Sequence, residues 1–350
     1  MKKIFFAFVF FAFCNNISAK DRSKFYAPSN SLFQYNGRID FSNPERPTMW
    51  ASATAINFSF KGKECKAIIT DEKLYGTSHN YVDIIVDGKY KHIQLKDKKN
   101  EIVIGENLSD KIYHVTIYKS SEAIIGYIQF EGIYCNKLIK SQAEPTRKIE
   151  FFGDSITSGM GDDTTNMGCH KGQWYDNTNA YKTYGAITAR ALDAQYYLTS
   201  VSGIGLMHSC CDMDVIMPQV YDKISLRENK IPWDFSKYQP DVVSVCLSQN
   251  DGLQDSAKFC SAYVKFLGEL RMHYPGAVIF CLSSPMADAA LFAQTKKYLP
   301  SVLNAIGDKN IHSFFFTGQF TAGCDSHPSG SQHAEIAKQL TAYIKAVMRW

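Results

Sequence analysis

Beyond its first twenty residues, the sequence has no apolar run of the ~20 residues that a membrane-spanning helix needs. It also has no long run of lysine or arginine, no internal repeat and no low-complexity tract. Only 21% of its 350 residues are charged, and its formal net charge is +4. These absences argue against a nucleic-acid partner and against a disordered chain. With 45% hydrophobic residues, a chain of this length predicts a globular protein of about two domains.

The one long apolar run lies at the N-terminus, where Lys2 and Lys3 precede residues 4–14. The small residues Ser18 and Ala19 follow it. A basic, an apolar and a small-residue region in this order are typical of a secretory signal peptide. We therefore predict that residues 1–19 are removed by cleavage after Ala19. The remaining chain is then exported, to the periplasm or the medium, without a membrane anchor.

Cleavage would leave nine of the ten cysteines, an odd number, in an oxidising compartment. Cys246 and Cys281 lie within apolar, strand-like runs, which is typical of small core residues. The better disulfide candidates lie in polar, loop-like segments and are Cys169, Cys210, Cys211 and Cys324. Their pairing does not follow from the sequence. A zinc site would need residues whose spacing matches no zinc pattern, namely His208, Cys210, Cys211 and Asp212, so we predict neither metal nor cofactor.

Residues 20–145 show the pattern of a β domain. Apolar residues alternate with period two in three segments, 55–60, 81–86 and 113–118. The dipeptide Asp87-Gly88 directly follows the second of them and is a strong signal for a hairpin turn. Many short strands with regular turns predict a β-sandwich or jelly roll.

From residue 146 onward, strand-like and helix-like segments alternate. The expected strands are 148–152, 196–201, 241–247, 277–282 and 311–316, and the expected helices are 180–192, 259–270, 289–303 and 334–347. This alternation predicts a three-layer α/β domain over residues 146–350, with a parallel, flavodoxin-like sheet. Ligands bind such sheets beyond the carboxyl ends of the strands.

Chemically useful residues follow the ends of these strands. Ser155 stands in a glycine-flanked turn that would expose its hydroxyl and its amide together, as a nucleophile requires, or it could simply cap the next helix. Gly203 offers an unobstructed amide, and the Asn250 side chain could donate to an oxyanion, although Asn-Asp is also ordinary turn chemistry. His327 could act as a base and Asp325 could orient it, although a lone Asp-x-His is more often a loop.

The order Ser, Gly, Asn, His at successive strand ends resembles the SGNH, or GDSL-type, hydrolases. In the front half, residues 35–44, Trp50 and residues 80–88 resemble the jelly-roll domain of family 2 of the carbohydrate esterases. The likeness covers nearly all of the chain after residue 19. It implies a serine esterase without metal that removes O-acetyl groups from sugars or plant polysaccharides such as acetylated xylan or mannan.

The resemblance also implies roles for individual residues. Ser155 corresponds to the nucleophile, His327 to the general acid–base and Asp325 to the third member of the triad. The oxyanion hole is implied to use the amides of Ser155 and Gly203 with the side chain of Asn250. In relatives a main-chain carbonyl can orient the histidine instead of a carboxylate.

Other residues near these motifs allow two interpretations. Ser248 stands where the third motif usually opens with glycine, so a side chain must fit at that bend. Trp174 and Tyr175 could stack against a sugar ring, or they could pack within their loop.

Two rival functions remain at this point. An SGNH lipase or thioesterase would need an apolar trench for longer acyl chains, whereas the loops 161–178 and 206–240 are polar. A non-catalytic glycan-binding protein would have no need of the serine, asparagine and histidine motifs.

Overall fold

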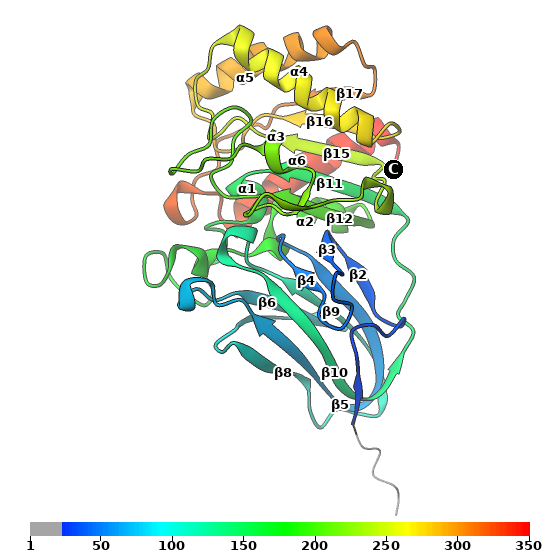
Figure 1. The fold of residues 1–350 in the computed structure, drawn as a ribbon. Helices are drawn as coiled ribbons and strands as arrows, with labels where there is room; N and C mark the ends of the chain where they lie inside the picture. The colour runs from blue at the N-terminus through cyan, green and yellow to red at the C-terminus, as the bar shows by residue number, and fades with distance from the viewer. Residues whose placement is uncertain (1–22) are drawn as a thin grey trace, which may run out of the picture.

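The computed structural model describes residues 23–350 and contains two main sheets, the antiparallel one below the parallel one in Figure 1. The predicted signal peptide and its cleavage site lie outside the described residues, and the domain limits 20–145 and 146–350 stay predictions. Across residues 23–350, no helix is long and apolar enough to cross a membrane.

The first sheet has ten strands, all paired antiparallel. Seven follow the path β3-β4-β10-β5-β9-β6-β7, while β1 pairs with β10, and β2 and β8 pair with β5. The strands are β1 (Lys24–Tyr26), β2 (Gln34–Asn36), β3 (Ile39–Asp40), β4 (Thr48–Met49), β5 (Ala55–Asp71), β6 (Tyr81–Val86), β7 (Lys89–Gln94), β8 (Lys99–Gly105), β9 (Lys111–Lys119) and β10 (Ile128–Ile139). Their apolar residues form one buried core that includes Phe58, Phe60 and Phe130. The predicted antiparallel β half is confirmed.

The predicted strands of this half match in place but not in length. β6 has the predicted limits, and Asp87-Gly88 links it to β7 with positive φ angles of 46° and 80°. β5 continues eleven residues beyond the predicted segment, to Asp71. Its extension contains charged residues, but Lys61 and Lys63 are exposed while Cys65, Ala67 and Ile69 belong to the core.

The second sheet is wholly parallel and has the order β12-β11-β15-β16-β17. Its strands are β11 (Arg147–Gly153), β12 (Ala194–Ser200), β15 (Val242–Cys246), β16 (Val278–Leu282) and β17 (Ile311–Phe314). Counted along the chain this is the order 2-1-3-4-5, so the predicted flavodoxin-like winding is confirmed. A separate hairpin of β13 (Lys223–Ser225) and β14 (Lys230–Pro232), which the sequence did not predict, lies between β12 and β15 in the chain.

Helices cover both faces of the parallel sheet. One face packs against α2 (Tyr184–Ala191) and α6 (Gly330–Met348), and the other against α3 (Met217–Val220), α4 (Ser256–His273) and α5 (Ala289–Ile306). Neighbouring residues of β11 divide between them, because Phe151 belongs to the first core and Phe152 to the second. The helix predicted from residue 180 begins at Tyr184 instead, because the Thr183 side chain caps it by accepting from the Ala186 amide.

All four predicted disulfide candidates are paired: Cys169 with Cys324, and Cys210 with its neighbour Cys211. Cys246 and Cys281 are buried free thiols in the strands of the parallel sheet, as predicted. The first disulfide joins the loop after α1 (Ser155–Ser158) to the segment before α6.

Candidate active site

Ser155 follows the carboxyl end of β11, which lies between β12 and β15 in the parallel sheet, and opens the single-turn helix α1. The cap of that helix is Asp154, whose Oδ1 accepts from the Ile156 amide at 3.0 Å. The alternative that Ser155 serves as the helix cap is therefore wrong. The Ser155 side chain is left free for chemistry, and 6% of the residue surface is exposed.

His327 contacts Ser155 from the loop before α6. Its Nε2 atom lies 2.8 Å from Ser155 Oγ, and its Nδ1 atom lies 3.0 Å from the main-chain carbonyl of Asp325. A carbonyl can only accept, so Nδ1 carries the proton and Nε2 is free to accept from the serine hydroxyl. Burial lowers the pKa of His327 below its usual 6.5, and the contact with Asp325 opposes this shift.

The Asp325 carboxylate is not in this contact. Its side chain is 40% exposed, and Oδ1 lies 3.7 Å from Nδ1 of the exposed His170. Asp325 and Ser326 both have left-handed backbone, with φ of 52° and 59°. The Asp325 carbonyl thus takes the position that the carboxylate holds in a Ser-His-Asp triad.

Three hydrogen-bond donors gather at the ends of adjacent strands. Within residues 23–350, the main-chain amides of Ser155 and Gly203 donate to no protein acceptor. Gly203 has φ of +84°, a conformation that glycine adopts without strain. The Asn250 amide nitrogen lies 2.9 Å from the Ile204 carbonyl and 3.3 Å from Asp154 Oδ2. Such donors can hold the oxygen of a tetrahedral intermediate.

The Asp154 carboxyl lies beside these donors. It is fully buried, and burial raises its pKa to about 7. Its side chain therefore changes charge near neutral pH, 3.3 Å from the Asn250 amide nitrogen.

Asp251 fixes the chain that follows Gly203, a role that the sequence analysis missed. Its carboxylate accepts from the amides of Leu206, Met207 and His208 at 2.9, 2.6 and 2.9 Å. Its place directly after Asn250 is the one sequence signal that could have drawn attention to it.

Ser248 does fit a side chain at the bend where the motif usually has glycine. It is 1% exposed and its φ is 145°, in the region that favours glycine. Its hydroxyl is buried without a partner among the described residues. The departure noted in the sequence thus costs local strain.

The two aromatic candidates differ in exposure. They lie in the short 3₁₀-helix η3 (Trp174–Asn177), where Trp174 is 40% exposed and Tyr175 only 5%. Tyr175 packs against His79 of the antiparallel half with ring centroids 5.2 Å apart. Trp174 is therefore the one that solvent can reach.

The residues considered for zinc show no ligand geometry. Cys210 and Cys211 are bonded to each other. In the part of the chain that the structure describes, no group of three or more histidine, cysteine, aspartate or glutamate side chains is arranged to hold a metal ion.

A cavity of about 510 Å³ lies beside the site, since it is lined by the sequence neighbours of Asn250 and His327. Its lining mixes polar and aliphatic residues: Gln249, Gly252, Leu253, Met286, Asp288, Leu291, Gln319, Thr321 and Ser326.

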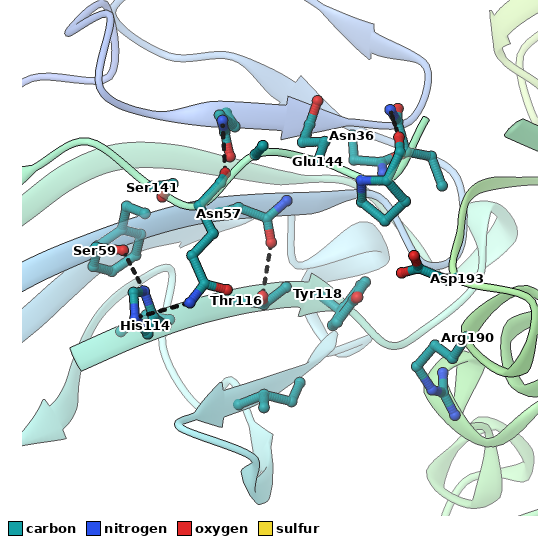
Figure 2. Close-up of a pocket in the computed structure, with 18 of the residues that line it drawn as sticks. Asn36, Asn57, Ser59, His114, Thr116, Tyr118, Ser141, Glu144, Arg190 and Asp193 are labelled. Atoms are coloured by element: carbon teal, nitrogen blue, oxygen red, sulfur yellow. Dashed lines mark hydrogen bonds between the residues drawn. The ribbon is translucent and has the colours of Figure 1, made fainter. Parts of the chain in front are cut away.

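A second cavity, of about 370 Å³, lies between the antiparallel sheet and the segment 141–145 (Figure 2). Its wall mixes polar and apolar residues, and within it Thr116 Oγ1 of β9 donates to Asn57 Oδ1 of the neighbouring strand β5 at 2.7 Å. Arg190 and Asp193 face it from the parallel half (Figure 2). Neither Ser155 nor His327 lines this cavity, so it is separate from the candidate site.

Comparisons with known proteins show the family of this chain. Residues 35–145 match the family described as carbohydrate esterase 2 N-terminal, and residues 151–346 match the GDSL-like lipase/acylhydrolase family. The cellulase/esterase CelE of Acetivibrio thermocellus is 33% identical over 332 residues, which are 90% of this chain. This chain spans 39% of the length of CelE.

Two further relatives match over nearly their whole length. An acetylxylan esterase / glucomannan deacetylase of Cellvibrio japonicus is 26% identical over 97% of this chain and 96% of its own. The structure of a family two carbohydrate esterase from Clostridium thermocellum, in complex with cellohexaose, is 32% identical. It covers 91% of this chain and 99% of that chain, with a TM-score of 0.83.

Proposed function

The chain belongs to family 2 of the carbohydrate esterases, and on that premise we propose that it removes O-acetyl groups from sugars or plant polysaccharides through an acetyl-enzyme on Ser155. The observation that carries the proposal is the 2.8 Å contact between His327 Nε2 and Ser155 Oγ. Nucleophile and base stand at hydrogen-bonding distance, and two main-chain amides without a protein acceptor stand at neighbouring strand ends with the Asn250 side-chain amide.

The first half of the reaction forms the acetyl-enzyme. Ser155 Oγ attacks the acetyl carbonyl carbon while His327 Nε2 takes the hydroxyl proton. The Asp325 carbonyl holds the imidazole in the required tautomer and stabilises the positive charge that forms on it. The carbonyl oxygen, now negative, accepts from the Ser155 and Gly203 amides and the Asn250 side chain.

The acetyl-enzyme is complete when His327 gives its proton to the sugar oxygen, the bond between the acyl carbon and that oxygen breaks, and the deacetylated sugar leaves. In the second half, a water molecule attacks the acetyl-enzyme while His327 takes its proton. His327 returns this proton to Ser155 Oγ as the acyl–Oγ bond breaks and acetate leaves. Loss of one oxyanion donor is expected to lower kcat by about 10²–10³-fold.

The substrate is proposed to be an acetylated oligo- or polysaccharide. The relative named acetylxylan esterase / glucomannan deacetylase makes acetylated xylan and glucomannan the first substrates to test. Trp174 offers an exposed ring on which a sugar could stack. Export after cleavage at Ala19 would bring the enzyme to such substrates, and N-terminal sequencing of the secreted protein tests that step.

Acetate release from acetylated xylan and glucomannan tests the function. We expect release by the wild type and its loss by several orders of magnitude in Ser155→Ala, with an unchanged melting temperature. Near-wild-type turnover in Ser155→Ala would remove this serine from the mechanism. Sugar binding without acetate release by the wild type would favour the non-catalytic glycan-binding alternative.

A further inference from the structure

A loop of the antiparallel half reaches behind the candidate oxyanion hole. It joins β9 to β10 and contains the 3₁₀-helix η2 (Ala123–Ile125). Ala123 is fully buried and belongs to the same apolar cluster as Val201 and Ile204, which flank Gly203 in the chain. This part of the first sheet is therefore built into the core of the second.

Glu122, the residue before η2, holds Ser202 at two points. Its Oε2 accepts from the Ser202 amide at 2.8 Å, and its Oε1 accepts from the Ser202 hydroxyl at 2.6 Å. Ser202 directly precedes Gly203. A carboxylate that accepts two bonds from one residue fixes both its main chain and its side chain, and such charge-assisted bonds are stronger than neutral ones.

Burying the Glu122 carboxylate costs desolvation free energy. Glu122 is fully buried, and burial raises its pKa, while the two bonds from Ser202 and the charge of Lys119 oppose the shift. Lys119 is fully buried as well, and its Nζ donates to the carbonyls of Ser121 and Glu122 at 2.7 and 3.0 Å. Apolar residues could join the two halves without this desolvation, so packing alone gives no reason for the charges.

The other side of Gly203 is also held. The Gly203 carbonyl accepts from the Cys210 amide at 2.8 Å. Without a Cβ atom, Gly203 itself imposes little on its own backbone angles. The direction of its amide therefore depends on how the residues on either side are held. Glu122 holds Ser202 through its hydroxyl and through the amide one peptide before that of Gly203, and the Cys210 amide holds the Gly203 carbonyl.

We propose that Glu122 is a positioning residue for the reaction: by holding Ser202, it keeps the Gly203 amide aimed at the oxyanion. The antiparallel half then contributes a residue that positions an oxyanion donor of the catalytic centre. This inference rests on the proposed function, because it has meaning only if Gly203 serves as an oxyanion donor.

Glu122→Gln tests the inference, because glutamine keeps the shape of the side chain but has one oxygen to accept with instead of two. We expect kcat for p-nitrophenyl acetate to fall by at least about tenfold, within the ~10²–10³-fold that losing one oxyanion donor costs. KM and the affinity for a deacetylated xylo-oligosaccharide should stay within about twofold, because ground-state binding does not use the oxyanion.

A second variant and a double variant sharpen the test. Ser202→Ala removes one of the two bonds and should lower kcat less than Glu122→Gln does. The double variant should lose less than the product of the two single effects, because both changes act on one interaction. If Glu122→Gln does not fold, Glu122→Asp replaces it, since the shorter side chain keeps the charge but loses reach.

The control is a different buried ion pair that joins the halves. Arg38 Nη2 lies 2.8 Å from Glu150 Oε1 on β11, and neither residue contacts Ser202. Arg38→Lys should lower the melting temperature without a selective fall in kcat. A matched fall in melting temperature and no selective change in kcat for Glu122→Gln would overturn the inference.

The outcomes separate this inference from the proposed function. An inactive Ser155→Ala with fully active Glu122→Gln removes only the positioning role. An active Ser155→Ala removes both. An inactive Ser155→Ala with a kcat-selective loss in Glu122→Gln supports both.

Discussion

His327 Nδ1 donates to the main-chain carbonyl of Asp325 at 3.0 Å, while the carboxylate of the same aspartate is 40% exposed and turned to His170. A main-chain acceptor cannot be removed by a substitution that preserves the backbone. The orientation of the base therefore depends on the loop conformation more than on the side chain at position 325.

Asp325→Asn tests this dependence, because asparagine tolerates the left-handed backbone at φ of 52° and keeps the carbonyl. A carboxylate that serves as the third member of a triad costs about 10⁴ in kcat when it is replaced by its amide. We expect a fall of less than about tenfold here, measured as kcat on p-nitrophenyl acetate. A loss near 10⁴ would assign the role to the carboxylate after all.

The pH dependence of activity should reflect the buried histidine. The reaction needs His327 neutral, and burial lowers its pKa below 6.5. Activity is therefore lost as the pH falls through that lowered pKa and is retained above it. We expect kcat/KM to rise to a plateau with an apparent pKa below 6.5, which a pH–rate profile measures directly.

Asp154, with a pKa of about 7, predicts a second and smaller change near neutrality. Its ionisation places a negative charge beside the Asn250 amide. This step should disappear from the profile of Asp154→Asn, while the step assigned to His327 stays. If the main rise of kcat/KM occurs above pH 7 in both the wild type and Asp154→Asn, the assignment of that rise to His327 is wrong.

The sequence predicted that the candidate site residues would meet, because their motifs follow the ends of strands. Carboxyl ends of neighbouring parallel strands meet at one edge of a sheet, so Ser155, Gly203 and Asn250 had to come together once the sheet was recognised. His327 joins them from a position 172 residues away, from the loop before the last helix. The sequence also pointed to the strain at Ser248, because serine stands there at a position where the motif usually has glycine.

Other features depend on how the halves pack, and no local pattern reports them. Glu122 meets Ser202 only because one loop of the first sheet enters the core of the second, 80 residues away in the chain. The carbonyl contact of Asp325 follows from its φ of 52°, a backbone angle that the sequence does not specify. The Cys169–Cys324 pairing likewise depends on two loops meeting.

The disulfide between Cys169 and Cys324 should support both stability and activity. It closes a loop of 155 residues, and Cys324 lies three positions before His327. Changing both cysteines to serine should lower the free energy of unfolding by about 2–5 kcal/mol, as is usual for native disulfides. Because the amide of His327 also donates to the Cys324 carbonyl, kcat should fall as well.

Chemical unfolding and initial rates on p-nitrophenyl acetate measure the two effects. Cys260→Ser is the matched control, since Cys260 is a half-buried free cysteine on α4. It should leave both quantities near wild type. Equal unfolding free energies for the wild type and the double serine variant would show that the two cysteines are not bonded in solution.

The acyl-chain preference separates a deacetylase from a lipase or thioesterase of the same type. The cavity of about 510 Å³ beside Asn250 and His327 mixes aliphatic residues with glutamine, aspartate, serine and threonine. Each CH₂ that enters an apolar trench gains ~0.8 kcal/mol, whereas one that is forced into a closed or polar pocket costs about 1–3 kcal/mol. Whether kcat/KM rises or falls with acyl-chain length therefore shows whether the acyl pocket is an apolar trench or a closed pocket.

We expect kcat/KM to fall from acetyl through butyryl to octanoyl esters of p-nitrophenol, by about tenfold for each ~1.4 kcal/mol of clash. Met286→Ala is the diagnostic variant, because Met286 lines the cavity and its truncation enlarges the apolar part. If longer acyl chains enter there, this variant should gain on butyryl esters relative to acetyl esters. A series that rises with chain length in the wild type would show that Leu253, Met286 and Leu291 form an acyl trench. That result would move the substrate from acetylated sugars to longer esters, while the role of Ser155 as the nucleophile would stand, because both chemistries require it.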